Sequence, residues 1–141
     1  MKTEPFVIER TYDANAARVW AAITDIDQMR QWYFDMDDFK PEPGFKFRFE
    51  GGPPETVYVH FCEVKEVVEM EKLSYSWTYE GYPGHSVVTF ELFPEGDRTR
   101  VRLTHSGVET FPQDKKEFGR DSFAAGWTEI IGKMLKEYVE G

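Results

Sequence analysis

The stretch DSFAAGWTEIIGKMLKEYVEG, residues 121–141, predicts one long amphipathic helix at the end of the chain. Its apolar side chains recur at steps of three or four residues, which places them on one face of a helix, while the charged side chains fall mainly elsewhere. The predicted apolar stripe consists of Phe123, Trp127, Ile130, Ile131, Met134 and Tyr138. Because these side chains are bulky, the helix needs a large apolar partner surface.

The residues before this helix supply that surface as a run of predicted strands. From Phe45 to His105, apolar and polar side chains alternate with the period of two that is typical of half-buried strands. The inward-facing rows are Phe45, Phe47 and Phe49; Leu73, Tyr75, Trp77 and Tyr79; Val88, Phe90 and Leu92; and Val101 and Leu103. The turn sequences EGYPGH and PEGD separate consecutive strands, so we expect antiparallel pairing in a meander.

A strand and two short helices are predicted at the start of the chain. Residues 6–12 alternate like a strand, after which Asp13 or Asn15 can cap a first helix. Asp25 or Asp27 can cap a second helix. The apolar residues of these helices are Ala16, Val19, Trp20 and Ile23, then Met29, Trp32 and Tyr33. This order of elements predicts an α+β fold in which a mostly antiparallel sheet curls around the C-terminal helix and leaves a cavity between them.

Composition limits the classes of partner. At 141 residues the chain is sized for one domain, residues 1–141, and its net charge of −9 argues against nucleic acid or an anionic membrane surface as a partner. Because Cys62 is the sole cysteine, no disulfide can form within the chain. The sequence has no signal peptide and no apolar run long enough to span a membrane, so we expect a cytoplasmic protein.

Three segments carry a family pattern in a fixed order and spacing. They are IERTYDANAARVWAAITDIDQMRQWYF (8–34), VVTFELFPEGDRTRVRLTHSGVE (87–109) and FAAGWTEIIGKMLKEYVE (123–140). The most specific pieces are Val19-Trp20, Trp32, the strand and turn from Thr99 to Gly107, and Gly126-Trp127. Together they resemble the family named for the activator of the heat-shock-protein ATPase. That family belongs to the START-like, or SRPBCC, superfamily, whose fold is shared with the birch pollen allergen.

The resemblance implies a helix-grip fold with an apolar cavity between the C-terminal helix and a sheet of about six or seven strands. Because the superfamily includes lipid and hormone binders, polyketide cyclases and ring-hydroxylase subunits, the fold does not settle the function. Our leading hypothesis is the binding of a small hydrophobic or aromatic ligand in the cavity. The alternatives are a cyclase- or hydrolase-like enzyme that uses the same cavity, and an interaction protein that stimulates a chaperone ATPase.

The partners of the chain follow from these hypotheses. A ligand-binding protein would hold a small apolar molecule, whereas an interaction protein would bind a chaperone, and a homodimer stays open. Eukaryotic co-chaperones use an additional domain on their client. We do not expect such a domain in this chain, which weakens the co-chaperone alternative.

The predicted cavity residues come from both the sheet and the helices. They are Trp20, Phe47, Trp77, Tyr79, Phe90, His105, Phe123, Trp127, Ile130 and Met134. His105 continues the alternation of Val101 and Leu103, and we expect it at the mouth of the cavity, where an imidazole can transfer a proton or hydrogen-bond a ligand. The same aromatic rows are equally typical of a packed core, and the sequence does not distinguish a lined space from a filled one.

Metal binding and catalysis find little support in the sequence. His60 and Cys62 lie two residues apart and so share one face of a strand, and both residue types bind zinc or copper. Two ligands do not make a site, and no catalytic or phosphate-binding motif occurs, so we expect no metal, no cofactor and no catalytic set. We expect Cys62 to be structural, and Arg48, Arg100 and Arg102 to face solvent.

Overall fold

The computed structural model describes residues 4–33, 36, 38–51, 57–112, 114–115 and 118–141. Its elements in chain order are β1 (Phe6–Tyr12), α1 (Ala16–Thr24), α2 (Ile26–Trp32), β2 (Lys46–Gly51), β3 (Tyr58–Val68), β4 (Lys72–Tyr79), β5 (Ser86–Glu95), β6 (Arg98–Ser106), the 3₁₀ turn η1 (Val108–Thr110), α3 (Arg120–Glu129), the π-helical turn η3 (Ile130–Met134) and α4 (Leu135–Glu140). This order confirms the predicted α+β fold.

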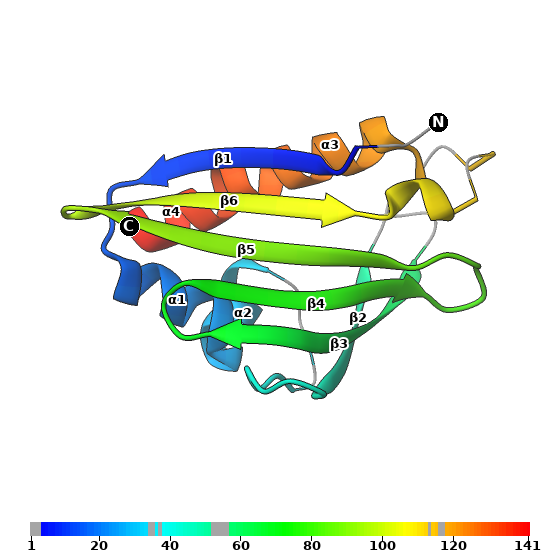
Figure 1. The fold of residues 1–141 in the computed structure, drawn as a ribbon, viewed down its shortest axis with the longest axis horizontal. Helices are drawn as coiled ribbons and strands as arrows, with labels where there is room; N and C mark the ends of the chain where they lie inside the picture. Colours follow the sequence, from blue (N-terminus) through cyan, green and yellow to red (C-terminus); the bar gives the residue numbers. More distant parts are fainter. Residues whose placement is uncertain (1–3, 34–35, 37, 52–56, 113, 116–117) are drawn as a thin grey trace.

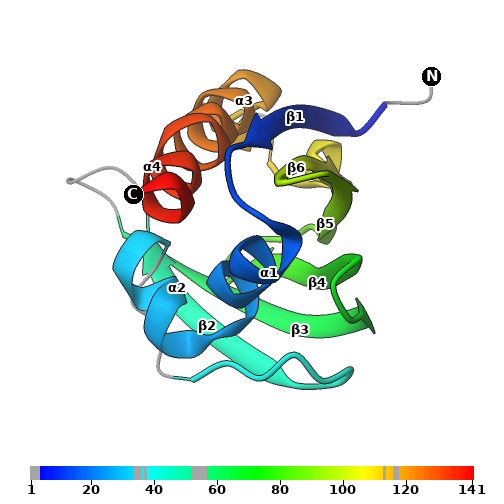
Figure 2. The ribbon, with the colours of Figure 1, turned by 90° about the vertical axis from the view of Figure 1, so that its left-hand side faces the viewer.

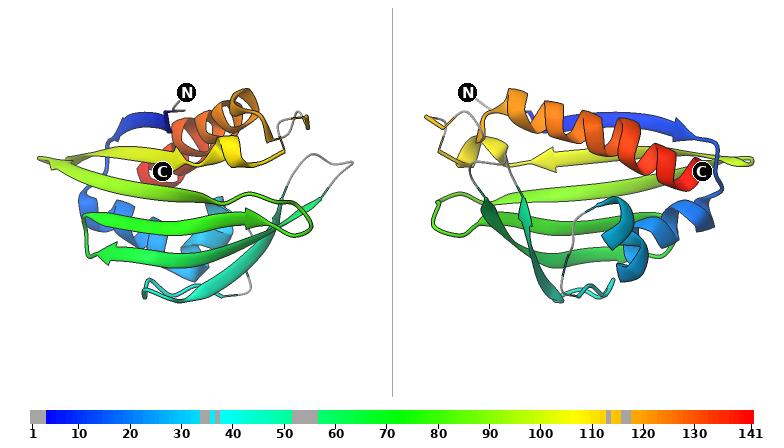
Figure 3. Two further views of the ribbon diagram at one scale, coloured as in Figure 1. Left: turned by 45° about the vertical axis from the view of Figure 1, so that its right-hand side comes forward. Right: turned by 180° about the vertical axis from the view of Figure 1, so that it is seen from behind.

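Six strands form one antiparallel sheet in the order β1-β6-β5-β4-β3-β2 (Figure 1). Strands β2 to β6 are joined as a meander of neighbours, while β1 reaches the far edge and pairs with β6, so that Phe6 lies opposite His105. Figure 2 shows that the sheet is strongly curved. The helix formed by α3, η3 and α4 lies along β1, while α1 packs against β5 and β6 and α2 lies over β2. Figure 3 shows the same helix from behind, running lengthwise beside β1 and β6.

Side-chain caps explain why the two short helices begin where they do. The side chain of Asn15 accepts a hydrogen bond from the backbone N–H of Arg18, and that of Asp25 accepts one from Asp27. Among the side chains of α1, Val19, Ala22 and Ile23 are buried, whereas Trp20 is half-buried. Figure 2 shows α1 and α2 together closing one end of the curved sheet.

The buried face of the C-terminal helix differs in part from the predicted stripe. Its buried side chains follow one another at steps of four residues: Phe123, Trp127, Ile131, Leu135 and Val139. Ile130, Met134 and Tyr138, which the sequence placed on the stripe, are half-buried beside it. Leu135 and Val139 take their places.

The π-helical turn η3 explains this change of face. On an α-helix each step of four residues overshoots a full turn by about 40°, so a strict four-residue stripe drifts around the axis. In η3 the backbone N–H of Leu135 instead bonds the carbonyl of Ile130, five residues back, and this wider turn takes up part of the drift. The π-turn therefore keeps side chains before and after it on the face toward the sheet.

Two side chains from the N-terminal half hold this helix in place. The buried hydroxyl of Tyr12, at the end of β1, donates a hydrogen bond to the carbonyl of Ile131 inside the π-turn. The guanidinium of Arg18 on α1 donates to the carbonyl of Tyr138 at 2.8 Å, and it also lies 4.8 Å from the centre of the Tyr138 ring. Because cations are favourable near the C-terminal end of a helix, Arg18 also stabilises the last turn of α4.

The outer face of the sheet carries paired charges. Arg102 forms an ion pair with Glu9, Arg100 pairs with Glu95 at 3.1 Å, and both guanidinium groups lie over the ring of Phe93. The predicted outward direction of these arginines is confirmed. No helix in the described part of the chain is both long and apolar enough to cross a membrane.

The shifted stripe predicts unequal costs for two neighbouring substitutions. Leu135→Ala should lower the free energy of unfolding by about 2–5 kcal/mol, because Leu135 is fully buried and its truncation leaves a cavity. Met134→Ala should cost less than half as much, because Met134 is only half-buried. Urea denaturation followed by far-UV circular dichroism measures both values, and equal costs would show that the stripe keeps α-helical register.

Candidate functional site

The inner face of the sheet and the C-terminal helix meet through aromatic rings. Trp127 of α3 lies with its ring centre 5.6 Å from that of Trp77 on β4 and 6.3 Å from that of Phe90 on β5. Phe123, one turn earlier, lies edge-on to the imidazole of His105 at 5.0 Å. These five side chains form a cluster in which the sheet and the helix contact each other directly, and we call it the ring cluster.

The ring cluster contains half of the predicted cavity residues, and the others lie around it. Phe47 is buried on β2 and contacts Tyr75, while Tyr79 is buried at the end of β4 and hydrogen-bonds Trp77. Trp20, Ile130 and Met134 are half-buried at the margin of the core. That these residues line a ligand cavity stays a prediction.

A chain of hydrogen bonds runs through the middle of the ring cluster. The indole N–H of Trp127 donates to Nδ1 of His105 at 2.9 Å, and Nε2 of His105 lies 2.8 Å from the hydroxyl of Ser86. The hydroxyl of Ser86 in turn donates to the carbonyl of Trp77 at 2.8 Å. Because an indole N–H can only donate, Nδ1 must accept and the single proton of neutral His105 lies on Nε2. Each hydrogen in the chain therefore has an acceptor.

This arrangement argues against a Ser86–His105 catalytic pair. A histidine that activates a serine must accept the hydroxyl proton, yet Nε2 already carries a proton and Nδ1 is occupied by Trp127. His105 is also completely buried rather than at the mouth of a cavity, because Trp77, Phe123 and Trp127 surround its ring. The sequence placed His105 on the correct face of β6 and misjudged its depth.

A second set of polar groups lies along β4. The hydroxyls of Tyr33 and Tyr75 are 2.7 Å apart, which joins the end of α2 to the sheet. The indole N–H of Trp77 donates to the hydroxyl of Tyr79 at 2.9 Å. Burial raises the pKa of both Tyr75 and Tyr79 above the ordinary value, so these phenols stay protonated at neutral pH.

His60 and Cys62 share the inner face of β3, as the sequence predicted. The ring of His60 stacks on Phe49 at 4.5 Å, and its Nδ1 donates to the carbonyl of Tyr58 at 3.0 Å. Burial raises the pKa of the Cys62 thiol above its ordinary value, which disfavours the reactive thiolate. Within the described ranges, no three side chains of His, Cys, Asp or Glu are grouped as a metal site would require.

Several site residues escaped the sequence reasoning. Ser86 precedes the alternating row of β5, and nothing local marks it as a partner of a histidine nineteen residues away. Tyr33 stands at the end of α2, and its contact with Tyr75 depends on how α2 packs on the sheet. The alternating pattern already placed Tyr75 on the inner face. Its position two residues before the predicted cavity residue Trp77 was the one signal that could have marked Tyr75 as a site residue.

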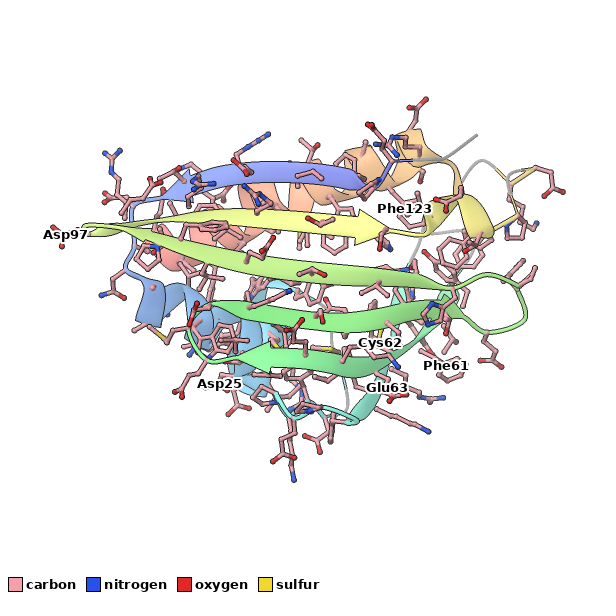
Figure 4. The ribbon with its side chains drawn as sticks, in the orientation of Figure 1. Asp25, Phe61, Cys62, Glu63, Asp97 and Phe123 are labelled. Atoms are coloured by element: carbon pink, nitrogen blue, oxygen red, sulfur yellow. The ribbon has the colours of Figure 1, made fainter. Side chains whose placement is uncertain are left out.

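The structure has open hollows at the sheet, outside the ring cluster. One of about 510 Å³ is lined by nine residues, namely Asp38, Lys46, Phe47, Arg48, Phe61, Cys62, Glu63, Ser76 and Thr78. Figure 4 labels Phe61, Cys62 and Glu63 on β3. Phe61 is 41% exposed there. None of the five residues of the ring cluster lines this open hollow, whereas Phe47, one of the predicted cavity residues, does.

Comparison with known proteins gives one family. A model described as Activator of Hsp90 ATPase homolog 1-like protein matches residues 13–140. Among curated proteins, no match is found.

Solved structures with the same fold come from several bacteria. Protein CV1439 from Chromobacterium violaceum superposes with a TM-score of 0.82 at 18% identity, covering 98% of both chains. Protein MLL2253 from Mesorhizobium loti gives a TM-score of 0.70 at 28% identity, covering 96% of this chain and 93% of its own. CalU16 from Micromonospora echinospora gives 0.74 at 26% identity, covering 96% and 75%. The likeness to CV1439 shows the fold alone.

The two buried histidines predict a loss of stability in mild acid. Burial lowers the pKa of His60 to about 4, and burial together with the nearby His60 lowers the pKa of His105 to about 3. Because an unfolded histidine titrates near 6.5, the unfolded chain takes up protons first as the pH falls. Stability is therefore complete above about pH 6.5 and declines below it, by about 2 kcal/mol per histidine at pH 5.

Urea denaturation at pH 7.5 and pH 5.0 measures this loss, which should total about 4 kcal/mol for the two histidines. In His105→Gln the loss between the two pH values should shrink by about half, because one titrating group is gone. His85 is exposed, so His85→Gln is the matched control and should leave the full loss in place. An unchanged loss in His105→Gln would mean that His105 does not titrate on unfolding.

Proposed function

The chain belongs to the family of Activator of Hsp90 ATPase homolog 1-like proteins, and from this membership we propose that it binds a small apolar or aromatic molecule between the inner face of the sheet and the C-terminal helix. The domain has an AHSA-like SRPBCC fold. Fold alone does not assign a function, so the proposal has to rest on the interior of this particular chain.

The observation that carries the proposal is the ring cluster. Between the helix and the sheet, large flat side chains make the contact, and their ring centres are 5.0–6.3 Å apart. These are the separations at which aromatic pairs attract each other edge-on or offset. A flat aromatic ligand can make the same contacts. When it enters, the contacts that protein rings make with each other are replaced by contacts with the ring of the ligand. Aliphatic packing of the same volume would offer no such exchange.

The polar groups of the interior favour binding over the enzyme alternative. In the Trp127–His105–Ser86 chain the histidine is neutral, buried and hydrogen-bonded at both nitrogens, so its lone pair on Nδ1 is already occupied and is not free to serve as a base. The Cys62 thiol is held in its protonated form. Neither group is therefore available as a catalytic base or nucleophile.

The experiment that tests the proposal uses the protein's own tryptophans. Trp77 and Trp127 are in contact, so a molecule that enters between them changes their fluorescence. The protein, purified without denaturation, should show a retained small molecule in native mass spectrometry or a saturable fluorescence change with members of a panel of aromatic compounds and lipids. If neither occurs with any compound, the rings are simply core.

Two phenylalanines on opposite faces of β5 give a matched pair of variants. Phe90→Leu removes an inner ring that contacts Trp127 and Tyr75, and it should weaken binding of a ligand found above about tenfold. Phe93→Leu removes an outer ring over which Arg100 and Arg102 lie, and it should leave the affinity unchanged within about twofold. Fluorescence titration measures both. Equal effects of the two variants would place the ligand away from the inner face.

A further inference from the structure

The hydroxyl of Tyr79 is only half satisfied. It accepts the indole N–H of Trp77 at 2.9 Å, but no described residue lies where it could accept the hydroxyl's own hydrogen. Tyr79 is 8% exposed, and its ring is packed against His60, Phe111 and Phe118 at centre distances of 4.7–5.0 Å. A hydroxyl that accepts one hydrogen bond can still donate its own hydrogen, and in a largely buried place that donor gains from meeting an acceptor.

The donor strength of this hydroxyl is raised by its neighbour. When an oxygen accepts one hydrogen bond, its own O–H becomes a better donor, because successive hydrogen bonds polarise one another. Trp77 supplies that first bond to Tyr79, and the ring of Trp77 itself belongs to the ring cluster. A ligand that contacts Trp77 therefore lies next to a donor that is ready for an acceptor.

The surroundings of Tyr79 are uncharged. Among the described residues, no Lys, Arg, Asp or Glu side chain is buried; the buried polar residues are two histidines, three serines and a threonine. Burial keeps His60 neutral by lowering its pKa, and keeps the phenols of Tyr33 and Tyr75 protonated by raising theirs. A carboxylate or a phosphate brought into this interior would find no counter-ion, and burying an unpaired charge is strongly unfavourable.

We propose that Tyr79 donates its free hydrogen to an uncharged carbonyl or quinone oxygen of the ligand, so that the protein selects neutral aromatic ketones over carboxylates. This inference rests on the proposed function, because it names the chemical class of the molecule bound in the same interior. Tyr79 then fixes the orientation of the ligand, while the ring cluster supplies most of the apolar contact area.

Three naphthalenes of nearly the same shape test the inference: 2-acetylnaphthalene, 2-isopropylnaphthalene and 2-naphthoate. The ketone has an acceptor oxygen, the hydrocarbon has none, and the carboxylate is charged. Equilibrium dialysis at pH 7.5 measures their dissociation constants for the full chain and for Tyr79→Phe. In the full chain the ketone should bind at least about a hundredfold more tightly than the carboxylate.

In Tyr79→Phe the affinity for the ketone should fall about tenfold relative to the affinity for the hydrocarbon, since only the ketone loses a hydrogen bond. The comparison uses the ratio of the dissociation constants of the ketone and the hydrocarbon within each variant. If the unpaired Trp77 N–H reduces the folded fraction, both constants change by the same factor and the ratio does not. Tyr12→Phe is the control, because it removes another buried hydroxyl, one that bonds the helix at Ile131, and it should leave the ratio unchanged.

The outcomes separate this inference from the proposed function. If the hydrocarbon binds but Tyr79→Phe does not change the ratio, or if naphthoate binds as tightly as the ketone, the inference is overturned while ligand binding stands. If none of the three compounds binds, the inference is also overturned, and the wider fluorescence panel decides the proposed function separately.

Discussion

The hydrogen bond from the indole of Trp127 to Nδ1 of His105 joins the C-terminal helix to the sheet at the centre of the interior. Because an indole can only donate, this bond places the proton of neutral His105 on Nε2. The Nε2–H group then donates to the hydroxyl of Ser86. The bond from Trp127 sets the position of the helix along the sheet, since a slip of one residue would leave buried polar atoms unpaired. It also occupies the lone pair that a general base would need.

The interior that results is aromatic, uncharged and almost fully paired. The ring cluster provides contact area, the Trp127–His105–Ser86 chain closes on the carbonyl of Trp77, and Tyr79 keeps one hydrogen to donate. Such an interior suits recognition of a neutral molecule better than proton transfer. The charged residues lie outside it, where Glu9, Arg100 and Arg102 pair across the outer face of the sheet and so keep charge away from the site.

Prediction from the sequence succeeded where a local period carries the information. The alternation in β4 and β5 placed Trp77, Tyr79 and Phe90 on the inner face, and the burial of all three confirms it. It failed where tertiary packing determines the local structure. Met134 was placed on the buried stripe because an α-helix was assumed throughout, whereas the π-turn brings Leu135 there instead. No periodic pattern in the sequence predicts a π-turn, because the turn forms where the helix adjusts to the surface on which it packs.

The sequence by itself determined the element order, the inward faces of the strands, the capped starts of the two short helices and the family. These follow from contacts between residues close in the chain, or from patterns that repeat along it. Only the tertiary structure decided the depth of His105, its pairing with Ser86 and Trp127, and the unused hydrogen of Tyr79. Burial and hydrogen-bond pairing are properties of the whole fold, because each depends on side chains that lie far apart in sequence.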